Sequence, residues 1–459
     1  MIHRYQKKGL NFVLDVNSGA VHLLDDISYA VSGLLDENMG DTCPQSIIDA
    51  LPDYTADEIR EAYDELYELK KAGQLFAQDD YIDVSRYIPV NAPVKALCLH
   101  VAHDCNLRCK YCFASTGDFG QGRKIMPPEI AKKAIDFVIA RSGVRHNIEV
   151  DFFGGEPLMA WDTVTQTVDY ARSLEEKHNK KFRFTITTNG LLLDEDKRKY
   201  INENMDNCVL SLDGRREVND EFRKTVAGTG SYDTIVPKFK ALVDERDPNL
   251  DYYARGTFTS HNLDFAEDVL SIADAGFDRL SVEPVTADPG CGYDLTEADL
   301  PKIEAEYDRL TDIMLERKKE GKPFTFFHFM VDLDQGPCVV KRLRGCGAGY
   351  EYVAVTPDGD IYPCHQFVGK DEFKQGSVLD QSFNMDIAQK FAGMNIYSRP
   401  KCQKCWAKFY CSGGCSAANY NMNHDMNDSY DLGCEMERKR LECAIYLKAM
   451  DKICANQSK

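Results

Sequence analysis

Three cysteines stand close together in the first part of the chain, at Cys105, Cys109 and Cys112, in the spacing Cys-x3-Cys-x2-Cys. A cubane iron-sulfur cluster is normally held by four cysteine thiolates, so a set of three leaves one iron open to a small chelating molecule. A structural zinc site, or three unrelated thiols in a cysteine-rich protein, is the simpler alternative for a motif this short. The spacing alone does not choose between a reactive cluster and these alternatives, and other parts of the chain have to separate them.

A second group of cysteines lies near the C-terminus, where seven of the seventeen cysteines fall between residues 346 and 434. In a chain without a secretion signal, we do not expect disulfides, because reducing compartments keep thiols free and such patterns then favour metal binding. The sequence therefore predicts a second metal-binding region. Its cysteines are Cys346, Cys364, Cys402, Cys405, Cys411, Cys415 and Cys434, with Cys338 shortly before them.

The overall charge argues against some classes of partner. With 74 acidic against 55 basic side chains, the chain carries a net charge of -19 at pH 7. An acidic protein repels phosphate surfaces, so we expect neither nucleic acid nor an anionic membrane as a partner. No apolar run reaches the roughly 18 residues that would span a bilayer, and the N-terminus lacks the apolar core of a signal peptide. We therefore expect a cytoplasmic protein.

Residues 1–85 are expected to form a small α+β domain that resembles a winged helix-turn-helix. Two short apolar runs, at 11–16 and 20–24, surround a turn and predict a hairpin. Three helical stretches follow, and the last begins at a capping box of Thr55 and Glu58 and ends at Gly73. The domain is acidic and lacks a basic recognition helix, so peptide binding along an exposed strand edge is favoured over DNA binding.

Residues 86–330 alternate between apolar runs and helical stretches, which predicts an α/β fold with parallel strands. The number of strands predicts a partial (β/α)6 barrel. In barrels of this kind the reactive groups gather at the carboxyl ends of the strands, where the Cys105 motif is expected to lie. The expected strands are 96–101, 148–153, 183–187, 208–212, 252–259 and 279–285.

The three-cysteine motif, with Phe113 directly after it, resembles that of the radical S-adenosylmethionine (SAM) superfamily. The resemblance extends to Gly154-Gly155-Glu156-Pro157, which matches the superfamily's GGEP element at the end of the second strand. It implies that the open iron binds the amino and carboxylate groups of SAM, and that the reduced cluster cleaves SAM to methionine and a 5′-deoxyadenosyl radical. The two glycines would let the ligand approach the backbone, and Glu156 would accept a hydrogen bond from the SAM ammonium.

Further SAM contacts are carried over from the superfamily residue by residue. Phe113 would lie beside the adenine, and Arg255 on the fifth strand would pair with the carboxylate. Polar residues after the third and fourth strands would contact methionine and ribose. Each position also has an ordinary alternative, as a core phenylalanine or a strand-end polar group. The strand-end residues are Thr187, Asn189, Ser211 and Asp213. The sequence assigns no catalytic acid or base.

The C-terminal cysteines, with Gly359 between the first two, keep the spacing of the seven-cysteine SPASM domain, which binds two auxiliary 4Fe-4S clusters. Finding both patterns in one chain favours three iron-sulfur clusters over zinc. The resemblance implies that Cys402, Cys405, Cys411 and Cys434 hold auxiliary cluster II, and that Cys346, Cys364 and Cys415 hold auxiliary cluster I. The fourth ligand of cluster I is either Cys338 or, as a hypothesis, a substrate cysteine thiolate, since metal coordination deprotonates a thiol. The predicted SPASM domain spans residues 331–459.

The order of the three domains resembles that of maturases of ribosomally made peptides. The segments 13–22 and 357–367 resemble the thioether-forming maturases of SCIFF peptides, which are rich in cysteine. The resemblance implies that the first domain binds the leader of a precursor peptide, and that a core cysteine sulfur becomes linked to carbon of another residue. An electron donor such as ferredoxin or flavodoxin would reduce the enzyme.

Two other functions compete with this interpretation. A formylglycine-forming sulfatase maturase, or another SPASM oxidase, would use the same clusters but would not need a leader-binding domain. An iron-sulfur transcription regulator would use the first domain to bind DNA, which its acidic character disfavours.

Overall fold

The computed structural model describes residues 1–83, 92–333 and 339–457. These residues fall into two compact units that interleave along the sequence. The terminal unit comprises Met1–Tyr87, Met330–Gly345 and Met394–Lys459, and the sheet unit comprises Ile88–Phe329 and Cys346–Gly393.

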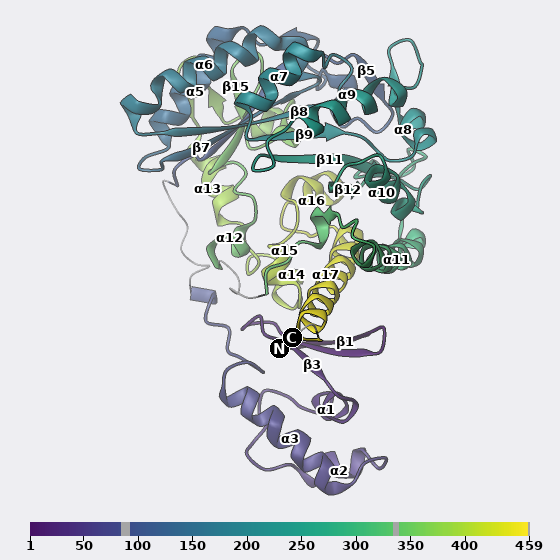
Figure 1. The fold of residues 1–459 in the computed structure, drawn as a ribbon. Coiled ribbons are helices and arrows are strands. Elements are labelled where there is room, and N and C mark those ends of the chain that lie inside the picture. The colour runs from purple at the N-terminus through teal and green to yellow at the C-terminus, as the bar shows by residue number, and fades with distance from the viewer. Residues whose placement is uncertain (84–91, 334–338, 458–459) are drawn as a thin grey trace. The chain divides into compact units, whose positions relative to one another are not determined.

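The sheet unit is built on one mixed sheet (Figure 1). Its parallel strands follow the order β13-β12-β11-β9-β8-β7-β4-β14, and β15, β16 and β17 continue the sheet as antiparallel strands. The predicted strands correspond to β4 (Ala96–His103), β7 (Asn147–Gly154), β8 (Lys181–Thr188), β9 (Asn207–Ser211), β11 (Asp251–Phe258) and β12 (Arg279–Pro284). The added strands are β6 (Lys124–Ile125), β13 (Thr325–Phe326), β14 (Tyr352–Val355), β15 (Asp360–Tyr362), β16 (Gly376–Ser377) and β17 (Ser382–Phe383). The predicted α/β fold with a partial barrel is confirmed.

Helices connect the parallel strands, and Figure 1 shows α5, α6 and α7 along one face of the sheet. The first of them begins at Pro128, because proline is well tolerated in the first turn of a helix. The helices of this unit are α5 (Pro128–Arg141), α6 (Trp161–His178), α7 (Glu195–Asn204), α8 (Arg216–Phe222), α9 (Tyr232–Asp244), α10 (Phe265–Asp274), α11 (Leu300–Lys319) and α13 (Met385–Gly393).

Strands β7 and β8 alternate between an apolar face and a more polar face. In β8, Phe182, Phe184 and Ile186 are fully buried, while Thr185 and Thr187 between them are only partly buried. A parallel strand covered on both faces is usually apolar throughout. The alternation here indicates that the second face of the sheet borders something other than a packed core.

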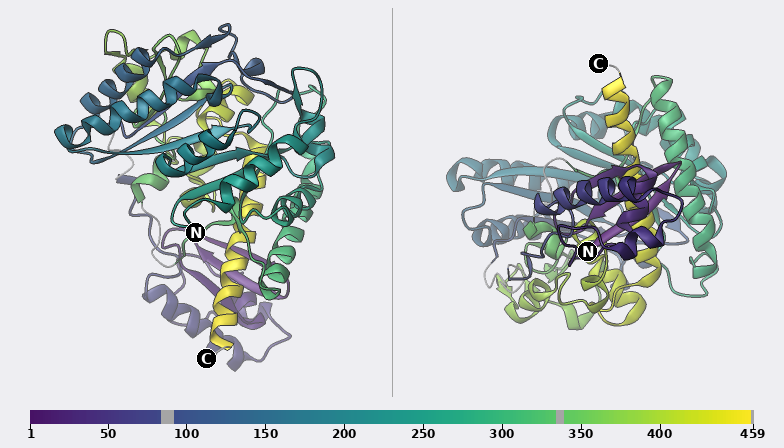
Figure 2. Two further views of the ribbon diagram at one scale, coloured as in Figure 1. Left: turned by 45° about the horizontal axis from the view of Figure 1, so that its top comes forward. Right: turned by 90° about the horizontal axis from the view of Figure 1, so that it is seen from below.

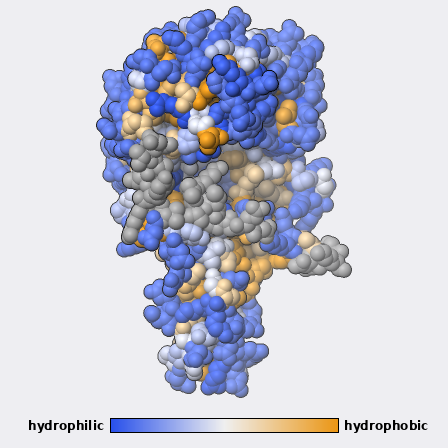
Figure 3. All heavy atoms as spheres, turned by 90° about the vertical axis from the view of Figure 1, so that its left-hand side faces the viewer, coloured by the Kyte–Doolittle hydropathy of each residue, from blue (hydrophilic) through white to orange (hydrophobic). Residues whose placement is uncertain are grey.

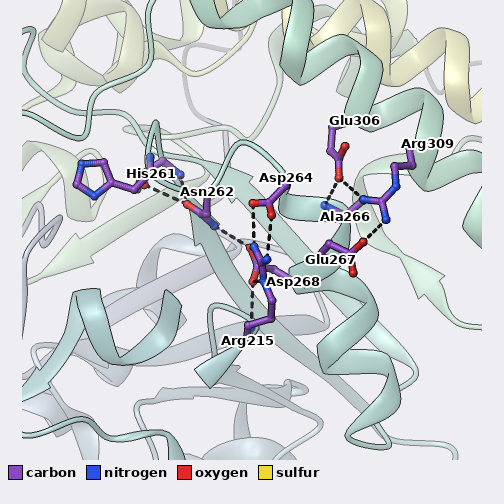
Figure 4. A network of polar contacts seen from close by, with 10 residues as sticks. Arg215, His261, Asn262, Asp264, Ala266, Glu267, Asp268, Glu306 and Arg309 are labelled. Carbon is purple, nitrogen blue, oxygen red and sulfur yellow. Dashed lines mark hydrogen bonds and ion pairs between the residues drawn. The ribbon is translucent and has the colours of Figure 1, made fainter. Parts of the chain in front are cut away.

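A polar network fixes the loops that follow β9 and β11 (Figure 4). Arg215, just before α8, donates hydrogen bonds to Asp264 and to Asp268, each at 2.8 Å. Asp268 is fully buried and also accepts a hydrogen bond from Asn262 at 2.9 Å. Because a buried carboxylate is costly without partners, these bonds tie the two loops firmly together.

The terminal unit begins with an antiparallel sheet in the order β1-β2-β3, formed by β1 (Ile2–Lys7), β2 (Leu10–Asp15) and β3 (Val21–Leu24). Three helices follow, α1 (Asp26–Ser32), α2 (Gln45–Ala50) and α3 (Ala56–Lys71). The predicted hairpin is β2 and β3, and the predicted capping box of Thr55 and Glu58 opens α3. Strand β1 was not predicted, because its sequence, with His3, Arg4, Gln6 and Lys7, lacks an apolar alternation.

The C-terminal elements of this unit end in a long helix that lies along β1 and β2 (Figure 2). His3 of β1 contacts the carboxylate of Glu442 at 2.9 Å, and the rings of Phe12 and Tyr446 meet edge to face. The short hairpin sheet thus buries one side against this helix. The elements are α12 (Val339–Arg344), α14 (Pro400–Gln403), α15 (Lys408–Cys411), α16 (Ser416–Asn423) and α17 (Asp431–Gln457).

The predicted division into domains 1–85, 86–330 and 331–459 differs from these two units. Residues 346–393 belong to the sheet unit, because β14 returns to pair in parallel with β4. Residues 394–459 belong to the terminal unit with the first domain. The sequence does not predict this division, because the pairing of β14 with β4 joins segments that are far apart in the chain and leaves no local pattern.

No helix in the described part of the chain is long and apolar enough to cross a membrane. The face drawn in Figure 3 is mostly hydrophilic, with apolar residues in smaller patches.

Candidate functional site

The predicted SAM-binding residues of the sheet unit, except Asp213, gather around one cavity of about 250 Å³. It lies at the carboxyl ends of the parallel strands, where the loops after β4 and β7 meet the ends of β8, β9 and β11. The cavity therefore occupies the polar face of the sheet, at the position expected for a reactive site. It is lined by Cys105, Cys109, Cys112, Phe113, Gly154, Gly155, Glu156, Thr187, Asn189, Ser211 and Arg255.

A buried ion pair fixes the cysteine loop from behind. Strand β5 (Leu107–Cys109) pairs with β10 (Arg223–Thr225), which sets Cys109 opposite Arg223. Arg223 donates to Asp213 at 3.0 Å, and the Tyr111 hydroxyl donates to the same carboxylate at 2.6 Å. Because Asp213 is fully buried, it needs these donors. Asp213 was expected to contact SAM, but it is not among the residues that line the cavity, and its carboxylate holds the cysteine loop instead.

The two glycines of the GGEP element make room for the cysteine loop itself. Gly155 donates to the Ala102 carbonyl at 2.7 Å, and Glu156 donates through its backbone to the Asp104 carbonyl at 2.9 Å. A Cβ atom on Gly155 would overlap that Asp104 oxygen, so no larger residue fits without moving the backbone. Gly154 adopts a φ of 122°, which glycine alone adopts readily. The glycines were expected to let a ligand approach the backbone, and in the structure they also make room for the chain that carries Cys105.

The Glu156 side chain joins the ends of β7 and β8. Its carboxylate is fully buried and accepts hydrogen bonds from Leu158 N at 3.0 Å, Thr188 Oγ1 at 2.7 Å and Asn189 N at 2.8 Å. Burial raises its pKa to about 7, although these three donors act in the opposite direction. A carboxylate can accept about four hydrogen bonds, and these three donors leave one acceptor position on Oε2. The predicted contact with an ammonium group therefore stays compatible with the site and stays a prediction.

Phe113 is 47% exposed at the cavity, so it is not the core residue that the sequence allowed as an alternative. Its ring centroid lies 5.4 Å from that of His365 and 6.4 Å from that of Phe153. An aromatic surface is thus available to a flat ligand group. Arg255 also lines the cavity, but its guanidinium is already paired with Glu283 at 2.5 Å, so a ligand carboxylate would have to share it.

The sulfur of Cys105 has two hydrogen-bond donors, Leu107 N at 3.4 Å and Asn189 Nδ2 at 3.5 Å. Asn189 was predicted as a SAM contact, and its amide lies against the sulfur of Cys105, a predicted cluster ligand. Burial raises the pKa of the Cys105 and Cys109 thiols to about 12 in the chain without iron. Coordination by a metal is what makes such thiols thiolates, and the two donors then stabilise the negative sulfur. The arrangement therefore fits a cluster.

Several residues at the cavity were not predicted from the sequence. They include Arg223, Glu283 and His365, each far from the cysteine motif in sequence. Burial lowers the pKa of His365 to about 4, so its imidazole is neutral at ordinary pH. His365 directly follows Cys364, a predicted cluster ligand, and this position in the sequence could have identified it. Arg223 carries no local signal, because only the pairing of β10 with β5 brings it to Cys109.

The cysteines predicted for auxiliary cluster II all lie in the terminal unit. Cys402 is in α14, Cys411 ends α15, and Cys434 is in the first turn of α17. Burial raises the pKa of Cys411 to about 12 and of Cys434 to about 11, and charges on the neighbouring thiols add to both shifts. Ser429 Oγ lies 3.4 Å from the Cys402 sulfur, and Arg438 donates to the Cys405 sulfur at 3.9 Å. Four thiols in one unit, two of them with polar partners, fit a 4Fe-4S cluster. Within the described residues, no three His, Cys, Asp or Glu side chains converge on a single-ion site.

The cysteines predicted for auxiliary cluster I are divided between the units, with Cys346 and Cys364 in the sheet unit and Cys415 in the terminal unit. Cys338 lies outside the described residues. Gly349 N donates to the Pro363 carbonyl at 3.0 Å, which joins the loop after Cys346 to the one before Cys364. Gly349 has a φ of 80°, as tight wrapping of this loop requires.

Two family models match the chain. Residues 99–254 match the radical SAM superfamily, and residues 346–406 match SPASM, an iron-sulfur cluster-binding domain. The first match begins within β4 and contains the cavity's cysteine and glycine loops.

Curated proteins and solved structures that are similar to this chain include enzymes that act on proteins or peptides. The cysteine-type anaerobic sulfatase-maturating enzyme of Clostridium novyi is 25% identical over 354 residues, which is 72% of this chain and 90% of that protein. Native anSMEcpe with bound AdoMet and the Kp18Cys peptide superimposes with a TM-score of 0.62 at 21% identity, covering 78% of this chain and 99% of that one. Streptococcus suis SuiB bound to its precursor peptide SuiA gives a TM-score of 0.51 at 16% identity, covering 94% of this chain and 98% of that one.

The chain thus contains a radical SAM domain and a SPASM domain, and it is a radical SAM enzyme. The cofactors of these domains are SAM and 4Fe-4S clusters. The cavity, its three thiols and the glycine turn together fit both groups.

Proposed function

We propose that this enzyme forms thioether crosslinks between cysteine sulfur and carbon in a cysteine-rich, ribosomally made peptide that it recognises through a leader. The observation that carries the proposal is the N-terminal sheet-and-helix module, Met1 to Lys71, in a chain that also has the radical SAM and SPASM domains. No residue of this module is among those that line the cavity, so a need to recognise a peptide best explains the module.

Strand β3 is the edge of that module best suited to an added strand. The other edge, β1, makes side-chain contacts with α17 through His3, Tyr5 and Lys7. Among the described residues, β3 is an edge strand that pairs with β2, and Leu23 on it is 43% exposed. The edge N-H and C=O groups of β3 would pair with an extended leader, and Leu23 would offer it an apolar contact.

Two of the similar structures hold a peptide, Kp18Cys on anSMEcpe and the precursor SuiA on SuiB. These likenesses support a peptide substrate for this chain. The SuiB likeness covers 94% of the chain. The part of the chain outside this likeness is shorter than the module, which runs from Met1 to Lys71 at the end of α3. The likeness to SuiB therefore extends into the module, which supports the proposal that the module binds a leader.

Bound at the cavity, SAM and the cluster would supply a 5′-deoxyadenosyl radical. The atoms balance when the acceptor carbon gives a hydrogen atom to that radical, the cysteine thiol gives up its proton, and one electron leaves to an auxiliary cluster. Phe113 and the glycine turn would orient the SAM, as Cys105, Cys109 and Cys112 hold the iron. The buried walls of the cavity would exclude water and other hydrogen donors.

Auxiliary cluster I is the proposed site for the substrate thiol. Cys346, Cys364 and Cys415 supply three thiolates, so one iron is open unless Cys338 closes it. A peptide cysteine bound there would be deprotonated and fixed for attack on carbon. Mössbauer spectra with and without precursor peptide test this, and an unchanged cluster I spectrum would contradict it.

Mass spectrometry of a co-expressed, genome-neighbouring cysteine-rich peptide tests the main proposal. Each crosslink removes two hydrogens, and alkylation then fails at the linked cysteines. An unmodified peptide with free thiols would contradict the proposal. A Leu23→Lys variant, which places a charge on the β3 edge, should lower peptide affinity while SAM cleavage without peptide is unchanged.

A second candidate is a cysteine-type formylglycine-forming enzyme. It is supported by the Clostridium novyi relative, of which the match covers 90%. The two candidates give different products, because formylglycine formation replaces a cysteine sulfur by oxygen, whereas crosslinking keeps the sulfur. A sulfatase-derived cysteine peptide offered to the purified enzyme separates them by product mass.

A further inference from the structure

The N-terminal module contacts the loop that carries Cys402, Cys405 and Cys411. The ring of His3, in β1, stacks on Trp406 with centroids 3.7 Å apart and planes within 1°. Val16, at the turn after β2, belongs to one buried apolar cluster with Cys402 and Phe409. A residue next to a predicted cluster ligand, and a ligand itself, therefore pack directly on the peptide-recognition module.

A buried ion pair also joins the N-terminal part of the chain to the Cys402 loop. Lys408, three residues after Cys405, has only 5% of its side chain exposed, and its ammonium donates to Asp79 at 2.8 Å. The Tyr397 hydroxyl donates to the other Asp79 oxygen. Burial alone would raise the pKa of Asp79, but the bonds from Lys408 and Tyr397 outweigh it and lower that pKa. A lysine buried so deeply depends on its partner, because an uncompensated charge inside a protein is strongly unfavourable.

Asp79 is itself held by the turn next to the proposed leader edge. The turn between β2 and β3 contains Asn17, whose side-chain amide donates to the Ala77 carbonyl at 2.8 Å. Asp15, the last residue of β2, accepts a hydrogen bond from Ala77 N at 3.1 Å. The segment that presents Asp79 to Lys408 is thus anchored on the hairpin that contains β3.

We propose that the N-terminal module is a structural part of the site of auxiliary cluster II. Asp79 is a positioning residue, because it fixes Lys408. Lys408 begins α15, the short helix that follows Cys405 and ends at Cys411, so the position of this helix sets where those two sulfurs point. This role of Asp79 goes beyond the proposed function. It depends on the proposed function only for the assignment of Cys402, Cys405, Cys411 and Cys434 to auxiliary cluster II.

The test uses the full-length, anaerobically reconstituted enzyme without any peptide. An Asp79→Asn variant should lose about a third of its iron, the share of one cluster in three. The spectroscopic signature of auxiliary cluster II should be lost or shifted, while that of the SAM cluster is retained. An Asp79→Glu variant, which keeps the charge, should restore the iron. Asp57→Asn is the matched control, because Asp57 pairs with Arg60 on the exposed surface of the same module.

A milder variant covers the case in which Asp79→Asn does not fold. Tyr397→Phe removes one hydrogen bond and keeps the ring, so it should keep all its iron but shift the midpoint potential of auxiliary cluster II. Full iron and an unchanged potential in Asp79→Asn, or an unchanged potential in Tyr397→Phe, would overturn the proposal. Iron content and potential do not depend on thioether formation, so failure of the proposed function would leave this result readable.

Discussion

The two cysteine loops that fit iron-sulfur clusters are built differently. The Cys105 loop in the sheet unit borders an open cavity, and its supporting ion pair, Asp213 with Arg223, is almost completely buried behind it. The Cys402 loop in the terminal unit is enclosed by an apolar cluster, and the arginine beside it, Arg438, is partly exposed together with its partner Glu435. One loop leaves space in front of its sulfurs, and the other is packed against neighbouring elements.

This difference indicates different tasks. A cluster that must bind a ligand needs an open face and rigid support behind it, because a misplaced ligand costs rate steeply. A cluster that only exchanges electrons needs four protein ligands and a surrounding that sets its potential. The glycine contacts of the first loop and the apolar packing of the second follow this division.

Cysteine replacements in the two loops should give the largest and most distinct effects. Cys109→Ala should abolish SAM cleavage, because a ligand of the open cluster is lost. Cys411→Ala should leave cleavage of SAM measurable and stop product formation on a peptide. Cleavage is followed as 5′-deoxyadenosine by liquid chromatography, with Cys208→Ala, a buried thiol outside both loops, as the control. Equal losses of cleavage in both variants would contradict the division of tasks.

Breaking the buried support should destabilise the sheet unit strongly. Arg223→Met leaves the Asp213 carboxylate buried without its charge partner, which costs about 3–5 kcal/mol of unfolding free energy. Arg216→Met is the control, because Arg216 and Asp233 are 59% and 64% exposed and such pairs contribute about 0–1 kcal/mol. Urea denaturation of both variants measures the difference. Similar losses would mean that burial of the first pair does not matter.

The pH dependence of stability should carry a signature of the cavity. Burial raises the pKa of Glu156 from 4.5 to about 7, so the folded chain holds this proton more tightly than the unfolded chain. Its contribution to stability is full below pH 4.5 and is lost as the pH rises to about 7, by about 3 kcal/mol. Glu156→Gln should remove that loss in denaturation curves recorded between pH 5 and 8 without SAM. Asp79 in the terminal unit has the opposite sign, because its pKa is lowered.

The smallest expected effect is on the potential of the enclosed cluster. Arg438→Gln removes a partly exposed positive charge that donates to the Cys405 sulfur. The loss should be about 1 kcal/mol, which lowers a one-electron midpoint potential by about 40 mV. Redox titration followed by electron paramagnetic resonance measures the shift. A shift in the potential of the SAM cluster, with no shift in that of auxiliary cluster II, would contradict the assignment of Arg438 to auxiliary cluster II.

Much of the fold followed from local patterns. The predicted parallel strands and the capping box of α3 are present, because each rests on residues adjacent in sequence. The part that did not follow is non-local. The return of β14 to β4 and the packing of α17 on β1 depend on pairings between distant segments, and β1 itself is too polar for periodicity to reveal.

The sequence by itself determined the chemistry of the cavity. The cofactors were predicted from the spacing of Cys105, Cys109 and Cys112 and from the GGEP turn, because ligand type and number are properties of the residues. Only the tertiary structure decided what supports them. Asp213 lies behind the cavity, Gly155 faces the cysteine loop, and Asp79 meets Lys408, since a contact between distant residues is set by how the elements pack.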